Sequence, residues 1–220
     1  MLACATVVAV LGALFAGQSR PDRFDAAVGR WLRSTIGTHP APLHVLANFG
    51  EPLLVTALTV VLVLAALVVR RWRGAVLAAV AVPLAAALTE LALKPLFGRT
   101  IGGALSFPSG HATSDFALAT VAAILFAAPA RPRIPPFARR LLLLGAFLFA
   151  AAVAVAMVGL WYHYFTDIIG GAAVGSGTVI LTALVLTALP RSRVRRIGAL
   201  GPSTSGHLCC GRIGYRRIRV

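Results

Sequence analysis

The stretch from residue 94 to residue 111 holds most of the residue types in this chain that could do chemistry. It reads KPLFGRTIGGALSFPSGH and stands immediately before a long apolar run. Amides at the start of a helix lack intrahelical partners and carry the positive end of the helix dipole, so they favour an anion. Lys94 and Arg99 add two cations, and Ser109 adds a hydroxyl. The stretch therefore predicts a site for a phosphate-like oxyanion, with His111 placed to pass a proton to it.

A second polar segment, WYHYFTD, occupies residues 161 to 167. Its His163 and Asp167 are four positions apart, a spacing that lets two side chains meet on one face of a helix. A carboxylate beside an imidazole fixes the tautomer of the ring and raises its basicity. This pair predicts an activated nucleophile or base, which must lie at the same end of the molecule as the first stretch if the two form one site.

The elements that must position these residues are apolar. The chain of 220 residues has 59% hydrophobic and 12% charged residues, with a mean hydropathy of +0.87. These values exclude an ordinary soluble globule and are typical of an integral membrane protein. The net charge of +15 does not indicate nucleic-acid binding here, because the arginines cluster between apolar runs. The three cysteines lack zinc-type spacing, so we expect neither a disulfide framework nor a metal site.

Six apolar runs predict an all-α, polytopic membrane protein, a bundle of six transmembrane helices. The runs cover residues 2–17, 52–69, 74–93, 112–130, 141–160 and 168–189. The first run is short and could be a cleaved signal peptide, although it lacks the basic residues that precede the apolar part of such peptides. We expect the membrane domain to cover residues 1–190. Residues 191–220 are basic and aperiodic, and we expect them to form a disordered cytoplasmic tail near anionic lipid head groups.

Basic residues predict the orientation. Fifteen of the 21 Lys and Arg residues lie after the second, fourth and sixth apolar runs. The positive-inside rule puts these regions in the cytoplasm, so both termini are cytoplasmic and the two polar segments face the periplasm or the cell exterior. The longest outer loop, residues 18–50, has apolar residues at helical spacing and predicts an amphipathic helix on the membrane surface.

The polar motifs resemble those of the type-2 phosphatidic acid phosphatase superfamily, which shares its site with vanadium-dependent haloperoxidases. That family has a lysine-led basic segment, a Pro-Ser-Gly-His segment, and a histidine followed four residues later by aspartate. Lys94, residues 108–111 and the pair His163 and Asp167 match these motifs. The resemblance covers residues 94–171, and the six-span plan extends it to most of the chain.

The resemblance implies roles for seven residues. His163 would attack phosphorus to form a phosphohistidine, Asp167 would orient it, and His111 would protonate the leaving oxygen. The phosphoryl oxygens would be held by Lys94, Arg99, Ser109 and the Gly110 amide. No metal or other cofactor is required. The chain would then hydrolyse a phosphate monoester or diphosphate of a lipid or isoprenoid carrier at the outer membrane face, as a metal-independent lipid phosphatase.

Two positions depart from the family pattern. The family has arginine seven residues after its lysine, where this chain has Ile101, and six residues before its second histidine, where this chain has Met157. Arg99 could replace the first arginine. Losing one cation from a phosphate clamp weakens oxyanion stabilisation by roughly 3 to 4 kcal/mol.

Two alternatives therefore stay open. One is a non-catalytic protein of the same fold that binds lipid phosphates. The other is a vanadate-dependent haloperoxidase, which is disfavoured because such enzymes are usually soluble. Neither the lipid nor the oligomeric state follows from the sequence.

Two acidic residues lie inside apolar runs, where charge is costly. Glu90 stands four residues before Lys94, and this spacing predicts an intrahelical ion pair that holds the lysine in place. Asp115 stands four residues after His111 and would either tune the histidine or make a hydrogen bond between helices. Glycines of the last apolar run are expected to permit close helix packing.

Overall fold

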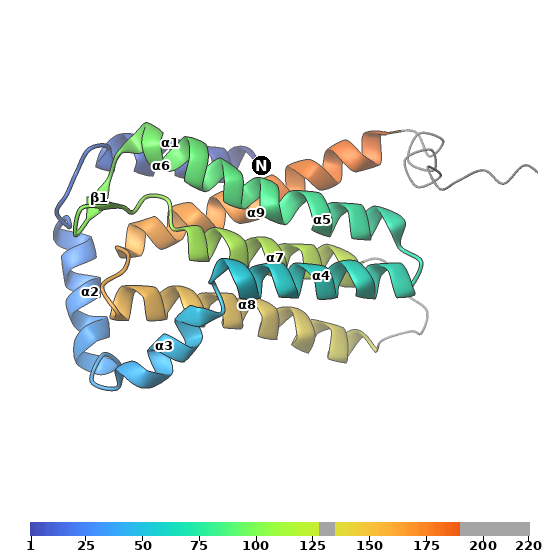
Figure 1. The fold of residues 1–220 in the computed structure, drawn as a ribbon, viewed down its shortest axis with the longest axis horizontal. Helices are drawn as coiled ribbons and strands as arrows, with labels where there is room; N and C mark the ends of the chain where they lie inside the picture. The colour runs from blue at the N-terminus through green and yellow to red at the C-terminus, as the bar shows by residue number, and fades with distance from the viewer. Residues whose placement is uncertain (128–134, 190–220) are drawn as a thin grey trace, which may run out of the picture. The chain divides into compact units, whose positions relative to one another are not determined.

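A computed structural model describes residues 1–127 and 135–189 (Figure 1). The expected cytoplasmic tail lies outside the described residues. The described part is almost entirely helical, with one short hairpin. In chain order its elements are α1 (Leu2–Phe15), α2 (Arg23–Thr35), α3 (Pro40–Asn48), α4 (Pro52–Val68), α5 (Trp72–Ala87), the π-helix η1 (Leu88–Leu93), α6 (Lys94–Phe97), β1 (Thr100–Ile101), β2 (Ala104–Leu105), α7 (Gly110–Ala127), α8 (Pro136–Gly159) and α9 (Phe165–Ala188).

All six apolar runs form helices, but fewer than six are long enough to be identified as membrane spans. Within the described residues, three stretches are long and apolar enough to cross a membrane: Trp72–Phe97, Pro136–Gly159 and Phe165–Ala188. Helices α3 and α4, bent by 51° at a short break, together make a fourth candidate. Helix α1 and the apolar part of α7 are shorter. The chain is a helical membrane protein, and its predicted count of six spans stays a prediction.

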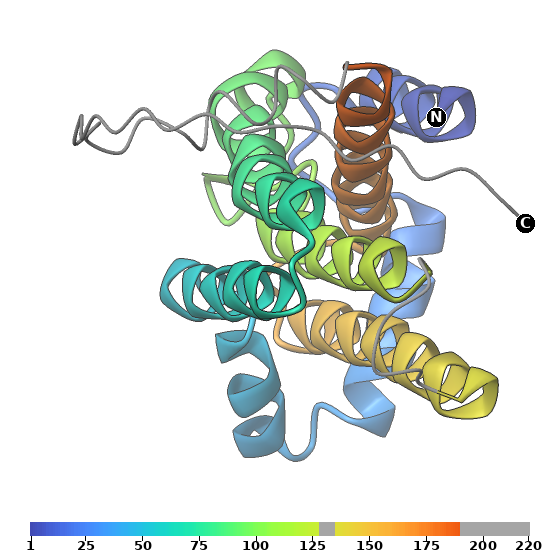
Figure 2. The same ribbon diagram turned by 90° about the vertical axis from the view of Figure 1, so that its right-hand side faces the viewer.

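Helix α7 lies in the middle of the bundle, where it packs against α4, α5, α8 and α9 (Figure 2). Its most extensive packing is with α9. A Cβ atom added to Gly171 would collide with the carbonyl oxygen of Ser109, and one added to Gly175 would collide with that of Thr113. The expectation that glycines permit close packing here is confirmed. This packing brings the polar starts of α7 and α9 side by side.

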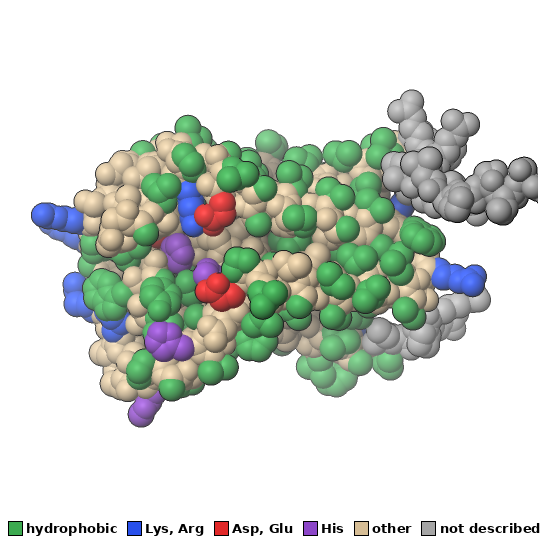
Figure 3. Space-filling model, viewed as in Figure 1, with side chains coloured by type: hydrophobic (Ala, Val, Ile, Leu, Met, Phe, Trp, Pro, Cys, Tyr) green, Lys and Arg blue, Asp and Glu red, His purple; other side chains and the backbone are tan. Residues whose placement is uncertain are grey.

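The core of the bundle is formed mainly by small and branched residues, whereas large apolar residues lie on its outside. Ala81 and Val121 are fully buried between α5 and α7. Leu91 and Leu148, by contrast, are 79% and 60% exposed. A surface rich in exposed apolar side chains, visible along the helices in Figure 3, fits contact with lipid tails rather than with water.

Helix α2 lies across one end of the bundle (Figure 1). Asp22 precedes it and accepts a hydrogen bond from the Asp25 amide at 2.7 Å, which satisfies one of the free donors of the first turn. Leu32 and Ile36 pack on the buried cluster that α2 shares with α8. The amphipathic helix predicted in the loop of residues 18–50 is therefore present.

The span that begins with α5 changes its helical geometry just before the candidate site. Pro95 has no N–H group and cannot complete an α-helical bond to the carbonyl four residues earlier. The segment before it, Leu88–Leu93, is π-helical, and the Lys94 amide donates to the carbonyl of Thr89, five residues earlier. Such segments are frequent at functional sites. Here the segment carries Glu90 next to Lys94 on the same side of the span.

A tight hairpin joins α6 to α7. Gly102 and Gly103 form its turn with φ of 57° and 86°, left-handed values that glycine adopts without steric cost. Ile101 pairs with Ala104, and Thr100 pairs with Leu105. Because side chains alternate along a strand, Ile101 and Thr100 point to opposite faces of the hairpin.

Candidate active site

A cavity of about 840 Å³ opens on one face of the bundle, beside the starts of α7 and α9. Lys94, Gly110, His111 and His163 line its polar end. The structure thus brings together four of the seven residues that the sequence indicated, from three separate parts of the chain. Figure 3 shows histidine side chains on this face lying between two acidic side chains.

His163 faces a carboxylate with one ring nitrogen. Its Nδ1 lies 3.6 Å from Oδ2 of Asp167, and that oxygen accepts a hydrogen bond from the Tyr164 amide at 3.0 Å. Nδ1 is buried and has no hydrogen-bond partner among the described residues. A distance of this kind is common for catalytic hydrogen bonds that tighten only when substrate binds. With Nδ1 turned to Asp167, we assign the Nδ1–H tautomer, which leaves the Nε2 lone pair available to a ligand.

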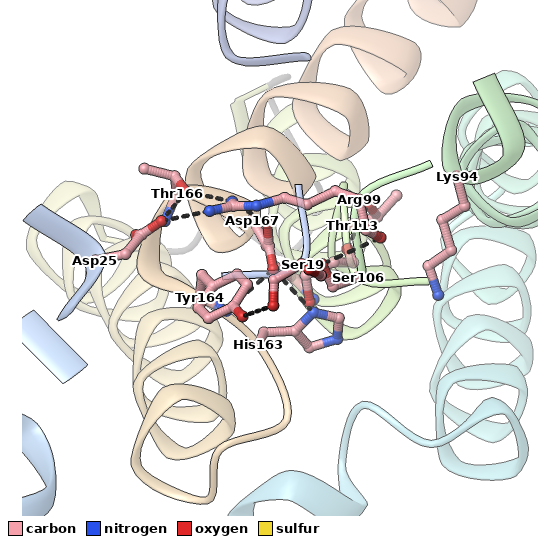
Figure 4. Close-up of polar contacts among 12 residues, drawn as sticks. Ser19, Asp25, Lys94, Arg99, Ser106, Thr113, His163, Tyr164, Thr166 and Asp167 are labelled. Carbon is pink, nitrogen blue, oxygen red and sulfur yellow. Dashed lines mark hydrogen bonds and ion pairs between the residues drawn. The ribbon is translucent and has the colours of Figure 1, made fainter. Parts of the chain in front are cut away.

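Asp167 is held in turn by a buried network that the motifs did not show (Figure 4). The Arg99 guanidinium donates to Asp167 Oδ1 at 2.6 Å and to Asp25 Oδ2 at 2.7 Å. Asp25 also accepts from the Thr166 amide at 2.9 Å and from its hydroxyl at 2.7 Å. The side chains of both ion pairs are fully buried. The network ties α2 and the segment after α6 to the first turn of α9.

Arg99 therefore lies elsewhere than the sequence indicated. We expected it to hold a phosphoryl oxygen, but it does not line the cavity. Its guanidinium instead lies between the rings of Phe15 and Tyr164, at 4.3 and 4.4 Å from their centroids. Two carboxylates accept hydrogen bonds from the guanidinium and two aromatic rings lie against it. Together these groups hold the cation more strongly than the cavity would. Burial also raises the pKa of Tyr164, whose hydroxyl donates to the carbonyl of Ser19.

Ser109 also lies outside the cavity lining. It is fully buried, and its Oγ accepts a hydrogen bond from the Ala112 amide at 3.4 Å, as a helix-capping serine does. Its own amide donates to the backbone carbonyl of Asp167 at 3.0 Å. Ser109 thus fixes the start of α7 against the start of α9. Within residues 1–127 and 135–189, no protein group accepts a hydrogen bond from the amides of Gly110 or His111.

Lys94 forms the ion pair that its spacing predicts. Its Nζ lies 2.7 Å from Oε1 of Glu90, with 14% of the lysine side chain and 49% of the glutamate side chain exposed. No other lysine or arginine in the described part of the chain lines the cavity. Ile101 and Met157, which stand where the family has arginines, do line it. The cavity therefore lacks both of the cations that the family pattern would place there.

A second glutamate stands beside His111. Oε1 of Glu51 lies 3.7 Å from His111 Nε2, and more than half of the Glu51 side chain is exposed. Glu51 is far from His111 in sequence, so spacing gave no signal for it. Asp115 is buried, and its Oδ2 has no hydrogen-bond partner among the described residues. The predicted hydrogen bond from Asp115 to another helix is not found among the described residues.

His163 also borders a smaller cavity of about 450 Å³ on the side of α2. Arg30 and Arg33 line it together with Trp161, and the Arg33 guanidinium lies 3.1 Å from the centroid of a Trp161 ring. The motifs did not indicate these two arginines. Helical spacing alone predicted only that their helix would be amphipathic.

No group of three His, Cys, Asp or Glu side chains that could hold a metal ion occurs in the part of the chain that the structure describes. The polar end of the larger cavity instead offers an imidazole nitrogen, a second imidazole, one ammonium group and free helix-start amides. Such groups can attack, protonate and hold an oxyanion.

Comparisons with known proteins identify the fold and the family of the chain. A search of curated proteins found no match. A solved structure, the transmembrane PAP2-type phosphatidylglycerolphosphate phosphatase from Bacillus subtilis, aligns with a TM-score of 0.69 and 17% identity, covering 86% of this chain and 97% of that one. At this identity the likeness shows a shared fold. The model of the PAP2 superfamily matches residues 1–191, so the chain belongs to the PAP2 superfamily.

Proposed function

We propose that the chain is a membrane lipid phosphatase that hydrolyses a phosphate monoester or diphosphate of a lipid or isoprenoid carrier. The observation that carries the proposal is the position of His163, which has Asp167 beside Nδ1 and also borders the cavity that contains Lys94 and His111. Membership in the PAP2 superfamily supports it, as does the fold shared with a phosphatidylglycerolphosphate phosphatase.

The proposed reaction has two steps. First, Nε2 of His163 gives its lone pair to phosphorus, the bond from phosphorus to the ester oxygen breaks, and the leaving oxygen takes a proton from His111. A phosphohistidine results, together with a free alcohol from a monoester or a monophosphate from a diphosphate. Then a water molecule gives a proton to His111 and attacks phosphorus, the phosphorus–nitrogen bond breaks, and its electron pair returns to Nε2. Inorganic phosphate leaves, and both histidines regain their starting protonation states.

The phosphoryl oxygens would contact Lys94 and the free amides of Gly110 and His111. Preorganised donors of this kind stabilise the charge that moves to these oxygens in the transition state. We assign Arg99 a different role from the one its sequence position indicated. Together with Asp25 it acts as a positioning residue, because it holds the carboxylate that orients His163.

The lipid nature of the substrate is inferred from the walls of the cavity. Beyond its polar end the cavity runs between α4 and α5, where its lining includes Val60, Val63 and Val82. These side chains could accept an acyl or isoprenoid tail while the phosphate reaches the histidines. The distribution of basic residues supports a site on the outer membrane face, with both termini in the cytoplasm.

A second candidate function is a protein that binds lipid phosphates without hydrolysing them. Ile101 and Met157 favour it, because both line the cavity at positions where the family has arginine. A site that has lost two cations can retain a ligand through Lys94 and the amides while stabilising the transition state poorly.

The test is phosphate release from a panel of lipid phosphates by the purified full-length protein in detergent, without added metal. We expect His163→Ala to reduce release by about 10⁶-fold, the order found for loss of an activated nucleophile elsewhere. His39→Ala is the matched control, since His39 is exposed and does not line the cavity. Equal release by the wild type and His163→Ala would contradict the proposed mechanism. Binding of lipid phosphate without release by the wild type would support the second candidate.

A further inference from the structure

The carboxylate of Glu90 lies against both Lys94 and the start of α7. A Cβ atom added to Gly110 would collide with Oε1 of Glu90, and Nζ of Lys94 lies 3.9 Å from the same Cβ position. The carboxylate also contacts the lysine at 2.7 Å. It therefore lies beside both the only lysine of the cavity lining in the described residues and the first residue of α7.

These are the groups that the proposed function assigns to the phosphoryl oxygens. A carboxylate oxygen and a phosphoryl oxygen are both anionic acceptors of similar size, so the Glu90 oxygen stands in for one oxygen of the substrate. The replacement is incomplete, because the amides of Gly110 and His111 still have no acceptor among the described residues. The site thus retains donors for a phosphate while its cation is already paired.

The pairing of Glu90 with Lys94 affects how strongly the cavity attracts a phosphate, because the cavity lining has few cations. With Ile101 and Met157 in the lining and Arg99 buried elsewhere, Lys94 is the only Lys or Arg of the described residues that an incoming phosphate meets there. Glu90 neutralises that charge. Nearly half of the Glu90 side chain is exposed, which leaves it room to move aside.

We propose that Glu90 is an affinity-determining residue of the oxyanion site. Its carboxylate competes with the phosphoryl group for Lys94 and the start of α7, and it moves away when the phosphoryl group binds. This inference rests on the proposed position of the phosphate, but it does not require turnover. A purely structural role makes the opposite prediction: if Glu90 only held Lys94 in place, its removal would weaken oxyanion binding.

The experiment measures the affinity of the full-length protein for orthovanadate and for inorganic phosphate in detergent. We expect Glu90→Gln to bind both about tenfold more tightly than the wild type, the order expected for removing one partly exposed like charge next to the ligand. Glu51→Gln is the matched control, because it removes the same charge from the same face without touching Lys94. We expect the control to gain clearly less.

Three results would overturn the proposal: weaker oxyanion binding by Glu90→Gln, unchanged binding, or an equal gain in Glu51→Gln. Adding Lys94→Gln to the Glu90→Gln protein should abolish the gain, since the competition is for that lysine. Repeating the measurement in a His163→Ala background separates this inference from the proposed function. Absence of phosphate release by the wild type would count against the phosphatase, whereas the sign of the Glu90→Gln effect would still decide the role of Glu90.

Discussion

Arg99 and Lys94 are five residues apart in sequence, and the structure gives them opposite surroundings. Arg99 is fully buried, bridges Asp25 and Asp167, and lies between two aromatic rings. Lys94 borders an open cavity and pairs with Glu90, a half-exposed residue. Figure 4 shows the two cations on different sides of His163. Arg99 holds the carboxylate that orients His163, and Lys94 faces the space where a ligand would bind.

The difference shows how burial separates positioning from binding. Breaking a buried ion pair leaves a charge that water cannot solvate, so such a pair keeps its geometry. An exposed pair is worth much less and exchanges partners readily, because water and salt screen it. Arg99 is therefore suited to keep the carboxylate of Asp167 fixed beside His163. Lys94 is suited to exchange Glu90 for a phosphate.

The largest effect is expected when the buried network around Arg99 is broken. Arg99→Gln leaves Asp25 and Asp167 buried without their cation, and we expect it to lower the free energy of unfolding by about 3 to 5 kcal/mol. Unfolding of the full-length protein in detergent, followed by circular dichroism, measures the change. Arg99→Lys should recover only part of the loss, because one ammonium group cannot reproduce the forked contacts of a guanidinium.

Arg20→Gln is the control for this prediction, since it removes an arginine that is exposed and outside the network. Its free energy of unfolding should stay within about 0.5 kcal/mol of the wild type. If Arg99→Gln were as stable as Arg20→Gln, the network would not hold Asp167, and the positioning role of Arg99 would fail.

Local sequence patterns predicted the ion pair of Lys94 and missed the buried network of Arg99. The pairing of Lys94 with Glu90 and that of His163 with Asp167 follow from a spacing of four residues near helix ends. The meeting of these segments followed from apolar runs of similar length, which bring alternate connections to the same end. The position of Arg99 in the buried network could not be predicted, because its partner Asp25 is 74 residues away and no spacing rule connects them.

The number of membrane spans is a second feature that could not be predicted fully from the sequence. Hydropathy located the helices of the six apolar runs, because an apolar run is a local property, but it gave no signal for α2 or α3. The first run was already short in the sequence, and it forms a helix of 14 residues, shorter at 1.5 Å per residue than a hydrocarbon core of about 30 Å. Hydropathy could not show that α3 would join α4 at a bend of 51°. Lengths and bends depend on packing between distant segments.

An intermediate effect is expected when the cavity regains a cation. Ile101→Arg puts a guanidinium into the lining at a position where the family has arginine, and we expect it to tighten orthovanadate binding about tenfold. Inhibition or direct binding in detergent measures the change. Thr100→Arg adds the same charge to the opposite face of the hairpin and should leave affinity nearly unchanged. Equal tightening by both variants would mean that overall charge matters, not the cavity.

The smallest expected effect is on the stability of the cavity pair. Lys94→Gln removes a cation whose carboxylate partner is half exposed, so the free energy of unfolding should change by less than about 1 kcal/mol. The freed Glu90 carboxylate can turn to water, whereas Asp25 and Asp167 cannot once Arg99 is replaced. The same variant should bind orthovanadate more weakly, because the cation of the cavity is gone. Destabilisation as large as that of Arg99→Gln would show that Lys94 is a fixed structural cation, and Glu90 could then not exchange with a phosphate.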